Sequence, residues 1–211
     1  MSKRNLAVGV VMLGALVSGD ALAQSEASEK DEYYNDRYCM TCHGADGMGS
    51  EGINAPRLAG MEEWYLKRQL ENFRAGIRGT HEMDLQGREM RPMAMPLTDA
   101  GIADLLEWIG GWEYKPTEIT LAGDASAGRS LYAACAACHG DAAQGNEALG
   151  APALAGQNDW YLVTQLKNFK AGYRGSHADD KFGAQMVPMA GALADQTAIE
   201  NVVSYINTLG R

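Results

Sequence analysis

The sequence contains one unit written twice, and this duplication restricts the chain to folds made of two equivalent parts. A Cys-x-x-Cys-His motif begins at Cys39 and again at Cys135, 96 residues later. Other motifs repeat at the same offset: Ala55-Pro56 with Ala151-Pro152, Trp64-Tyr65 with Trp160-Tyr161, Arg78-Gly79 with Arg174-Gly175, and Met90 with Met186. Two copies are too few for a solenoid. The chain is therefore predicted to form two small domains in tandem.

The domain boundaries follow from the repeat and from one break in helical periodicity. Residues 113–122 contain Pro116 and show no periodic apolar pattern, so they are predicted to be a linker. The first domain then occupies residues 24–112 and the second residues 123–211, after a leader at residues 1–23.

The apolar pattern within each repeat is helical. Leu66, Leu70 and Phe73 are spaced i, i+4 and i+7, and the second repeat copies them. Asp99 and Asp195 precede further apolar helical patterns and are expected N-caps. With a short helix leading into each Cys pair and no alternating strand pattern, the fold class is all-α. Each domain has about three helices around long Gly- and Pro-rich loops, and its small core indicates that something else fills the interior.

The first residues have the three parts of a secretory signal peptide. Lys3 and Arg4 precede an apolar run at residues 6–17, and a small-x-small site ends at Ala23. The alternative is an uncleaved membrane anchor, but the run is shorter than the roughly 20 residues that span a bilayer. Cleavage is expected between Ala23 and Gln24, which releases a soluble protein into the periplasm, with peripheral membrane association as a possibility.

The two Cys pairs are predicted to anchor two covalent haem c groups. In this motif the thiols of Cys39 and Cys42, and of Cys135 and Cys138, form thioethers with the haem vinyl groups. The histidine that follows each pair, His43 or His139, lies beneath the iron as a ligand. A zinc ribbon expects its second Cys pair within about 20 residues. Structural disulfides would not require histidine at the same place twice.

Methionine is the predicted second iron ligand in each half. Met90 or Met93 in the first repeat, and Met186 or Met189 in the second, lie in a Pro-containing segment that is expected to be a loop before the last helix. Methionine opposite histidine raises the reduction potential of haem iron, which suits electron carriage. The rival ligands are His81 and His177, in Arg-Gly-[Thr/Ser]-His turns.

Two further repeated pairs have supporting roles. Arg78 and Arg174 could bond haem propionates, because guanidinium groups match carboxylates, or lie in solvated loops. Pro56 and Pro152 lie where a loop could offer the histidine a backbone carbonyl and so fix its ring.

Together these motifs resemble the diheme cytochrome c4 family over nearly all of the chain after residue 23. Each half has Cys-x-x-Cys-His, Pro-x-Leu-Ala-Gly, a Tyr-Leu…Gln-Leu helix, and Met before Leu-[Thr/Ala]-Asp. The resemblance implies two class I cytochrome c domains related by a pseudo-twofold axis, with their haems close together. The family's ligand precedes its Leu-Ser-Asp motif by seven residues, which selects Met90 and Met186. The Arg-Gly-[Thr/Ser]-His turns depart from the family pattern.

The expected function is a soluble electron carrier without enzymatic activity. It would pass single electrons from a quinol-oxidising complex or dehydrogenase to a terminal oxidase or reductase. The alternative is a cytochrome subunit of a periplasmic dehydrogenase complex. A haem enzyme, such as a peroxidase, would need an open iron position, whereas both halves keep their methionine. The net charge of −9 argues against nucleic acid and favours redox partners with a basic docking surface.

Overall fold

The computed structural model of the chain describes residues 38–209, and within that range it is helical. The predicted signal peptide and its cleavage site lie outside the described residues. Residues 38–43 are helical. The elements that follow are η1 (Glu51–Ile53), α2 (Glu63–Arg74), α3 (Leu85–Ala94), α4 (Asp99–Gly110), α5 (Ala125–His139), η2 (Glu147–Leu149), α6 (Asp159–Lys170), α7 (Gly183–Gly191) and α8 (Gln196–Ile206).

The all-α fold class is confirmed for this part of the chain. Between residues 38 and 209 the only extended pairing consists of two isolated antiparallel bridges, Ser50 with Ala55 and Asn146 with Ala151. None of the described helices has the length and apolar character needed to cross a bilayer.

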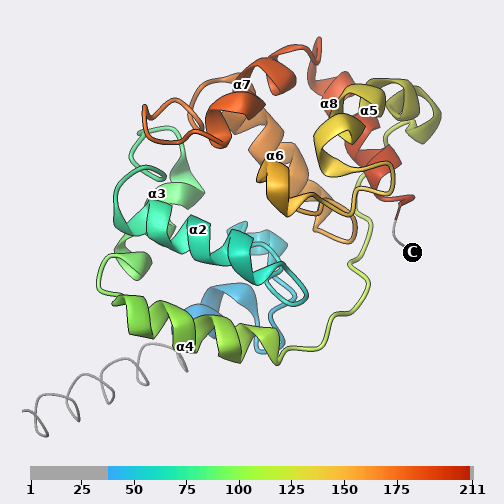
Figure 1. Ribbon diagram of the computed structural model, residues 1–211. Coiled ribbons are helices and arrows are strands. Elements are labelled where there is room, and N and C mark those ends of the chain that lie inside the picture. The colour runs from blue at the N-terminus through green and yellow to red at the C-terminus, as the bar shows by residue number, and fades with distance from the viewer. Residues whose placement is uncertain (1–37, 210–211) are drawn as a thin grey trace, which may run out of the picture.

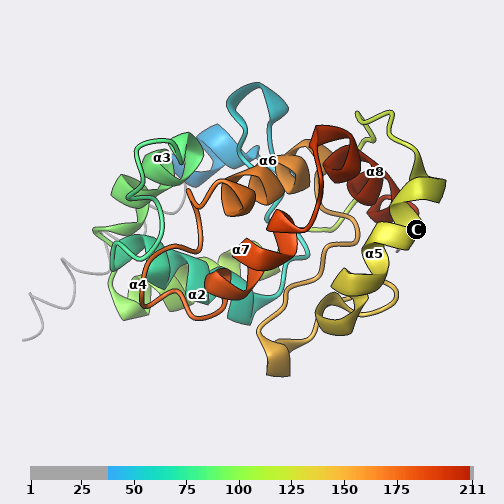
Figure 2. The same cartoon turned by 90° about the horizontal axis from the view of Figure 1, so that it is seen from above.

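Two separate hydrophobic cores divide the helices into two units. In the N-terminal unit α2 packs against α3 and α4, and in the C-terminal unit α6 packs against α7 and α8 while α5 crosses α8. Figures 1 and 2 show the two groups side by side, with α2 and α6 on the facing sides. The first core contains Leu66, Leu97, Ile102, Leu105, Leu106 and Ile109, and the second Tyr132, Ala143, Leu162, Val163, Leu193, Ile199, Val202, Val203 and Ile206.

The helix that leads into the Cys pair extends through it. The sequence suggested a helix most clearly up to residue 134, but α5 continues to His139. Gly140 and its counterpart Gly44 then adopt φ values of 81° and 82°, which a residue with a side chain rarely adopts. Each Cys-x-x-Cys-His motif therefore forms the last turns of a helix, and its histidine is the last helical residue.

The methionine segments are helices, so the expectation of a loop there is wrong. Met90 and Met93 lie in α3, and Met186 and Met189 lie in α7. Pro92 and Pro188 lie inside these helices, and each removes one intrahelical hydrogen bond because proline has no backbone N–H. Each unit therefore has one helix more than the three expected from periodicity.

The cap before the last helix differs between the halves. Asp195 is the N-cap of α8 and accepts a hydrogen bond from the amide of Ala198, as expected. In the first half the N-cap is Thr98, whose hydroxyl accepts from the amide of Gly101 at 2.9 Å. Asp99, the expected cap, is the first residue of α4.

The segment between α4 and α5 contains no helix and runs along one side of the molecule (Figure 1). The carboxylate of the buried Asp159 holds it in place. That carboxylate accepts hydrogen bonds from the amides of Thr120 and Leu121 at 2.7 and 2.9 Å, and from the Thr120 hydroxyl at 2.8 Å. The linker is thus fixed against the first turn of α6.

Candidate functional site

The two motif histidines occupy identical environments in the two units. The Nδ1 atom of His43 lies 2.7 Å from the carbonyl oxygen of Pro56, and Nδ1 of His139 lies 2.7 Å from that of Pro152. A carbonyl only accepts hydrogen bonds, so Nδ1 carries the proton in both rings and the lone pair is on Nε2. The expected support from Pro56 and Pro152 is therefore present.

A short loop brings each proline carbonyl under its histidine. In the first unit the chain leaves the helix at His43, whose carbonyl accepts from the amide of Gly49 at 2.8 Å. The chain then turns back through the bridge between Ser50 and Ala55. The second unit repeats this geometry, with the amide of Gly145 bonded to the carbonyl of His139 at 2.8 Å. The ring orientation is thus set by backbone bonds.

The Nε2 atom of His43 has a free lone pair and is available to bind a metal. It is buried and has no hydrogen-bond partner among the described residues. Burial lowers the pKa of His43, and the bond to Pro56 acts in the opposite direction. Burial likewise lowers the pKa of His139 against the effect of Pro152. Both rings are thus held neutral, the state in which imidazole is a metal ligand.

None of the four cysteines is part of a disulfide bond between described residues. Cys42 and Cys138 are exposed, while Cys39 and Cys135 are half-buried. Burial raises the pKa of the Cys39 and Cys135 thiols. Within residues 38–209 no cluster of three or more His, Cys, Asp or Glu side chains could hold a metal ion. The thiols therefore form neither disulfides nor a zinc site in this arrangement.

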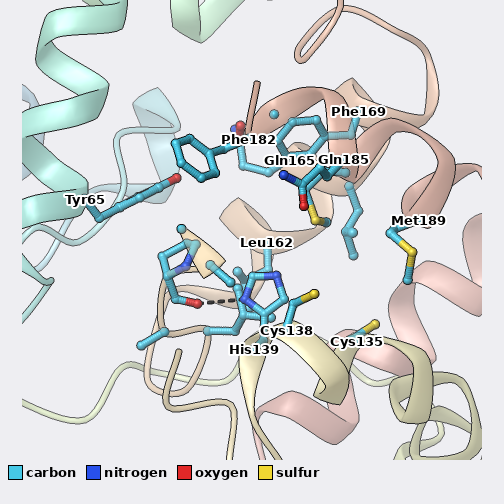
Figure 3. A pocket seen from close by; sticks show the side chains of 18 of the residues that line it. Tyr65, Cys135, Cys138, His139, Leu162, Gln165, Phe169, Phe182, Gln185 and Met189 are labelled. Carbon is cyan, nitrogen blue, oxygen red and sulfur yellow. Dashed lines mark hydrogen bonds between the residues drawn. The ribbon is translucent and has the colours of Figure 1, made fainter. Parts of the chain in front are cut away.

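A cavity opens beside His139 and continues to the boundary between the units (Figure 3). In Figure 3 the imidazole of His139 and the thiols of Cys135 and Cys138 lie on one side of it, with Phe169 and Gln165 opposite. The N-terminal unit also contributes to its wall, through Met61, Tyr65, Arg68 and Gln69. The cavity is thus built mainly by one unit and closed by the other.

Both candidate methionines of α7 line this cavity, but their exposure differs. Met186 is half-buried, whereas Met189 is 38% exposed and lies to one side in Figure 3. In α3 both Met90 and Met93 are half-buried. Both methionines of α7 thus lie beside the cavity of His139, with Met186 the more buried, and burial does not separate Met90 from Met93.

Two buried arginines form a symmetric hydrogen-bond network between the units. Arg78 donates to the Gln69 Oε1 atom at 2.8 Å and, across the interface, to Gln165 Oε1 at 3.1 Å. Arg174 mirrors it, donating to Gln165 Oε1 at 2.6 Å and to Gln69 Oε1 at 3.0 Å. Both guanidinium groups are only 7% exposed, so the solvated-loop alternative is excluded.

This network leaves donors free. The Nε atoms of Arg78 and Arg174 are buried and have no hydrogen-bond partner among the described residues. The partners of both guanidinium groups are uncharged Gln and Tyr side chains. A buried cation of this kind is stabilised by a nearby anion, and Arg174 lines the cavity beside His139. The carboxylates of a haem would supply that charge.

The two remaining histidines are placed away from this cavity. His81 and His177 line a separate pocket between the units, made by residues 77–81 and 173–177. The His81 ring stacks on Tyr173, with ring centroids 4.8 Å apart. His177 is not part of the cavity wall that contains His139, so the structure does not support it as a rival ligand in the C-terminal unit.

Comparison with known proteins identifies this architecture. The profile of the cytochrome c family matches residues 31–112 and again residues 125–210. The chain belongs to the cytochrome c family. The chain is 33% identical to cytochrome c4 of Azotobacter vinelandii over 97% of its own length and 95% of that protein's. This places it in the diheme cytochrome c4 family.

Solved structures agree with this cytochrome c4 assignment. Reduced cytochrome c4 from Pseudomonas stutzeri matches with a TM-score of 0.65 and 30% identity, over 87% of this chain and 98% of that one. The thiosulfate dehydrogenase (TsdBA) of Marichromatium purpuratum matches with a TM-score of 0.67 and 32% identity, and there the chain spans 39% of the solved one. A thiosulfate dehydrogenase electron acceptor of Stutzerimonas stutzeri is 33% identical over 82% of this chain and 79% of that protein.

As a diheme cytochrome c4, the chain carries two covalent haem c groups, and its residues fit them. The fit rests on the free, buried Nε2 of His43, on the unpartnered Nε atoms of Arg78 and Arg174, and on the apolar cavity at the second Cys pair. Sequence reasoning missed Arg68 and Phe182 at that cavity. The one available signal was that neither residue is repeated in the other half: Thr164 corresponds to Arg68, and Gln86 corresponds to Phe182.

Proposed function

We propose that this cytochrome c4 is a periplasmic carrier of single electrons between respiratory proteins, without enzymatic activity of its own. The observation that carries the proposal is the paired histidine geometry, with Nδ1 bonded to a proline carbonyl and Nε2 directed away from it, on both sides of one buried interface. Two such sites in one chain suit stepwise electron transfer. The predicted signal peptide supports the location.

We assign the iron and attachment positions as follows. Cys39 and Cys42 hold the first haem and Cys135 and Cys138 the second. The axial ligands are His43 and Met90 in the first unit, and His139 and Met186 in the second. The half-buried position of Met186 beside the exposed Met189 supports this choice in the second unit. The same spacing from Leu97 and Leu193 supports Met90 in the first.

The haem iron supplies the redox chemistry by changing its charge by one unit. The protein's contribution is to keep the ligands and charges around each iron in fixed positions during this change. The carbonyls of Pro56 and Pro152 fix the two imidazole rings and keep their protons on Nδ1. The buried guanidinium groups of Arg78 and Arg174 compensate negative charge at the interface. A methionine ligand in both halves leaves no iron position for a substrate.

The charge of the two units and the names of the relatives indicate two classes of redox partner. Residues 24–112 contain 9 basic and 16 acidic side chains, and residues 113–211 contain 7 and 10. The N-terminal unit is therefore the one expected to dock on a basic partner surface. A second candidate is the electron acceptor of a periplasmic dehydrogenase, favoured by the relatives from Stutzerimonas stutzeri and Thiomonas intermedia that are named as electron acceptors of thiosulfate dehydrogenase.

Stopped-flow reduction of the oxidised holoprotein distinguishes these functions. The purified protein is mixed with a reduced quinol-oxidising complex, or with thiosulfate and a thiosulfate dehydrogenase, over a range of ionic strength. Fast reduction by the complex, slowed by salt, supports the respiratory carrier. Fast reduction only with the dehydrogenase supports the second candidate. Turnover of thiosulfate by the cytochrome alone would contradict the proposal that it is not an enzyme.

A further inference from the structure

The repeat serves as an internal control for the haem surroundings, and Arg68 is one of the charged side chains that break its symmetry. The interface residues Tyr65, Gln69 and Arg78 recur as Tyr161, Gln165 and Arg174. Arg68, one residue before Gln69 in α2, has the uncharged Thr164 as its counterpart in α6. The N-terminal unit therefore contributes the cation Arg68 to the cavity of the C-terminal unit, whereas Thr164 contributes no charge to the N-terminal unit.

Arg68 crosses the boundary between the units and is fixed there. Its Nη2 atom donates to the carbonyl of Gly150 at 2.6 Å. Its guanidinium carbon lies 4.3 Å from the centroid of the Phe182 ring and 5.0 Å from that of Trp64. One hydrogen bond and two aromatic faces thus hold a half-buried charge in one place.

The two contacts in the C-terminal unit adjoin each other at one edge of the haem cavity, since a Cβ built on Gly150 would lie 2.3 Å from the Phe182 ring. Gly150 is two residues before Pro152, whose carbonyl orients His139. Phe182 is four residues before Met186 and immediately precedes α7. Arg68, Gly150 and Phe182 all line the cavity. Arg68 therefore closes one edge of the site between its histidine side and its methionine side.

The charges around this edge differ between the halves. The buried carboxylates Asp84 and Asp180, and the buried cations Arg78 and Arg174, occur once in each unit. Arg68 interacts electrostatically with both Asp180 and Arg174. It is thus a positive charge at this edge that Thr164 does not supply at the corresponding edge of the other unit. Other charges also differ between the halves, since the buried Arg57 and the half-buried Arg91 have Ala153 and Val187 as counterparts.

We propose that Arg68 is a positioning residue that selectively raises the reduction potential of the haem in the C-terminal unit. On reduction the iron of that haem accepts one electron from a donor redox protein, no bond breaks, and the net charge of the site falls by one. A fixed cation at a partly desolvated edge stabilises the reduced state over the oxidised state. The inference rests on the proposed function as an electron carrier.

The test is a potentiometric titration of the holoprotein with three single variants. Arg68→Thr copies the other half, Arg68→Lys keeps the charge but removes the planar stacking, and Thr164→Arg adds the cation to the other side. Each variant is also made together with Met90→His. This second substitution shifts the reduction potential of the first haem, so the one-electron step that does not shift belongs to the second haem. For Arg68→Thr we expect the equilibrium constant for reducing the second haem to fall about tenfold, while Arg68→Lys retains most of it.

The outcomes separate the charge from packing and from the proposed function itself. An equal fall in Arg68→Thr and Arg68→Lys, an equal shift of both haems, or no shift overturns the inference. If Arg68→Thr loses its haem or fails to fold, Thr164→Arg decides: a rise confined to the first haem supports the charge effect, and an unchanged potential overturns it. Failure of the proposed function looks different, because the parent protein would then show no two reversible one-electron steps.

Discussion

The guanidinium of Arg174 donates a hydrogen bond from Nη2 to the phenol oxygen of Tyr65 across the boundary between the two units, at 3.0 Å. The reciprocal pair, Arg78 and Tyr161, is longer at 3.4 Å. Each unit thus places an arginine beside its neighbour's tyrosine. The two redox sites are connected by buried side chains rather than by the linker alone, so the distance between them is fixed by packing.

This relationship predicts that Arg174→Met destabilises the protein far more than the loss of a surface arginine. The variant leaves the Tyr65 hydroxyl without its arginine donor and removes one of the two donors from the amide oxygens of Gln69 and Gln165, which costs about 1–3 kcal/mol of unfolding free energy. The measurement is guanidinium-induced unfolding of the oxidised holoprotein. Arg129→Met is the control, because Arg129 is exposed on α5 and its loss should change stability by less than about 0.5 kcal/mol. Equal effects of the two substitutions would contradict the role given to the network.

The glycine of the second Arg-Gly turn should not tolerate a side chain. Gly175 has a φ of 81°, and a Cβ built on it would lie 2.4 Å from the carbonyl oxygen of Gly183 in α7. Gly175→Ala should therefore cost about 2–4 kcal/mol in unfolding free energy and displace the helix that carries Met186. Gly191→Ala is the matched control at the end of the same helix, where a Cβ would meet nothing within 4 Å. A stable Gly175→Ala with an unchanged haem spectrum would show that the turn does not position α7.

The ligand assignment predicts opposite results for two methionines on one helix. Met186→Ala should remove the weak near-infrared sulfur–iron band of the second haem and leave that of the first, because the thioether is the iron ligand. Met189→Ala should leave both bands, because Met189 lies four residues before Leu193, whereas the assigned ligand lies seven residues before it. Absorption spectra of the oxidised proteins check this. Loss of the band in Met189→Ala alone would reverse the assignment.

Alkaline pH should destabilise the C-terminal unit through one tyrosine. Burial raises the pKa of Tyr132 to about 12, and its hydroxyl donates to the carbonyl of Gly140 at 2.7 Å. The protonated form is favoured in the folded state, so this contribution is complete below the ordinary tyrosine pKa of about 10 and is lost as the pH rises towards 12. Unfolding midpoints measured from pH 9 to 12 should fall less steeply in Tyr132→Phe than in the parent protein. Parallel curves would refute the prediction.

The sequence predicted the parts of this site that are local in the chain. The Cys pairs, the following histidines and the proline carbonyls lie within about 20 residues of one another, and their chemistry restricts their arrangement. The same holds for the middle and last helices of each unit, whose apolar periodicity is strong. The helices around Met90 and Met186 were missed because proline in the sequence indicates a loop, whereas Pro92 and Pro188 both lie inside helices in the structure.

The interface could not be read from the sequence, because it depends on how two folded units pack. Nothing in the pattern around Arg78 or Arg174 distinguishes a buried interface arginine from a solvated one. The contact between Arg68 and Phe182 joins residues more than 100 positions apart. Only the comparison of the two repeats, which shows Thr164 where Arg68 would recur, gave a sequence signal for that asymmetry.

A potentiometric titration of the exported, purified protein, followed in the visible and near-infrared, tests the central claim most directly. We predict two reversible one-electron steps per chain and a sulfur–iron band in the oxidised form that is lost on reduction, with no binding of carbon monoxide to the native reduced protein. A single electron per chain, or a high-spin haem that binds carbon monoxide, would contradict a carrier with two histidine–methionine haems.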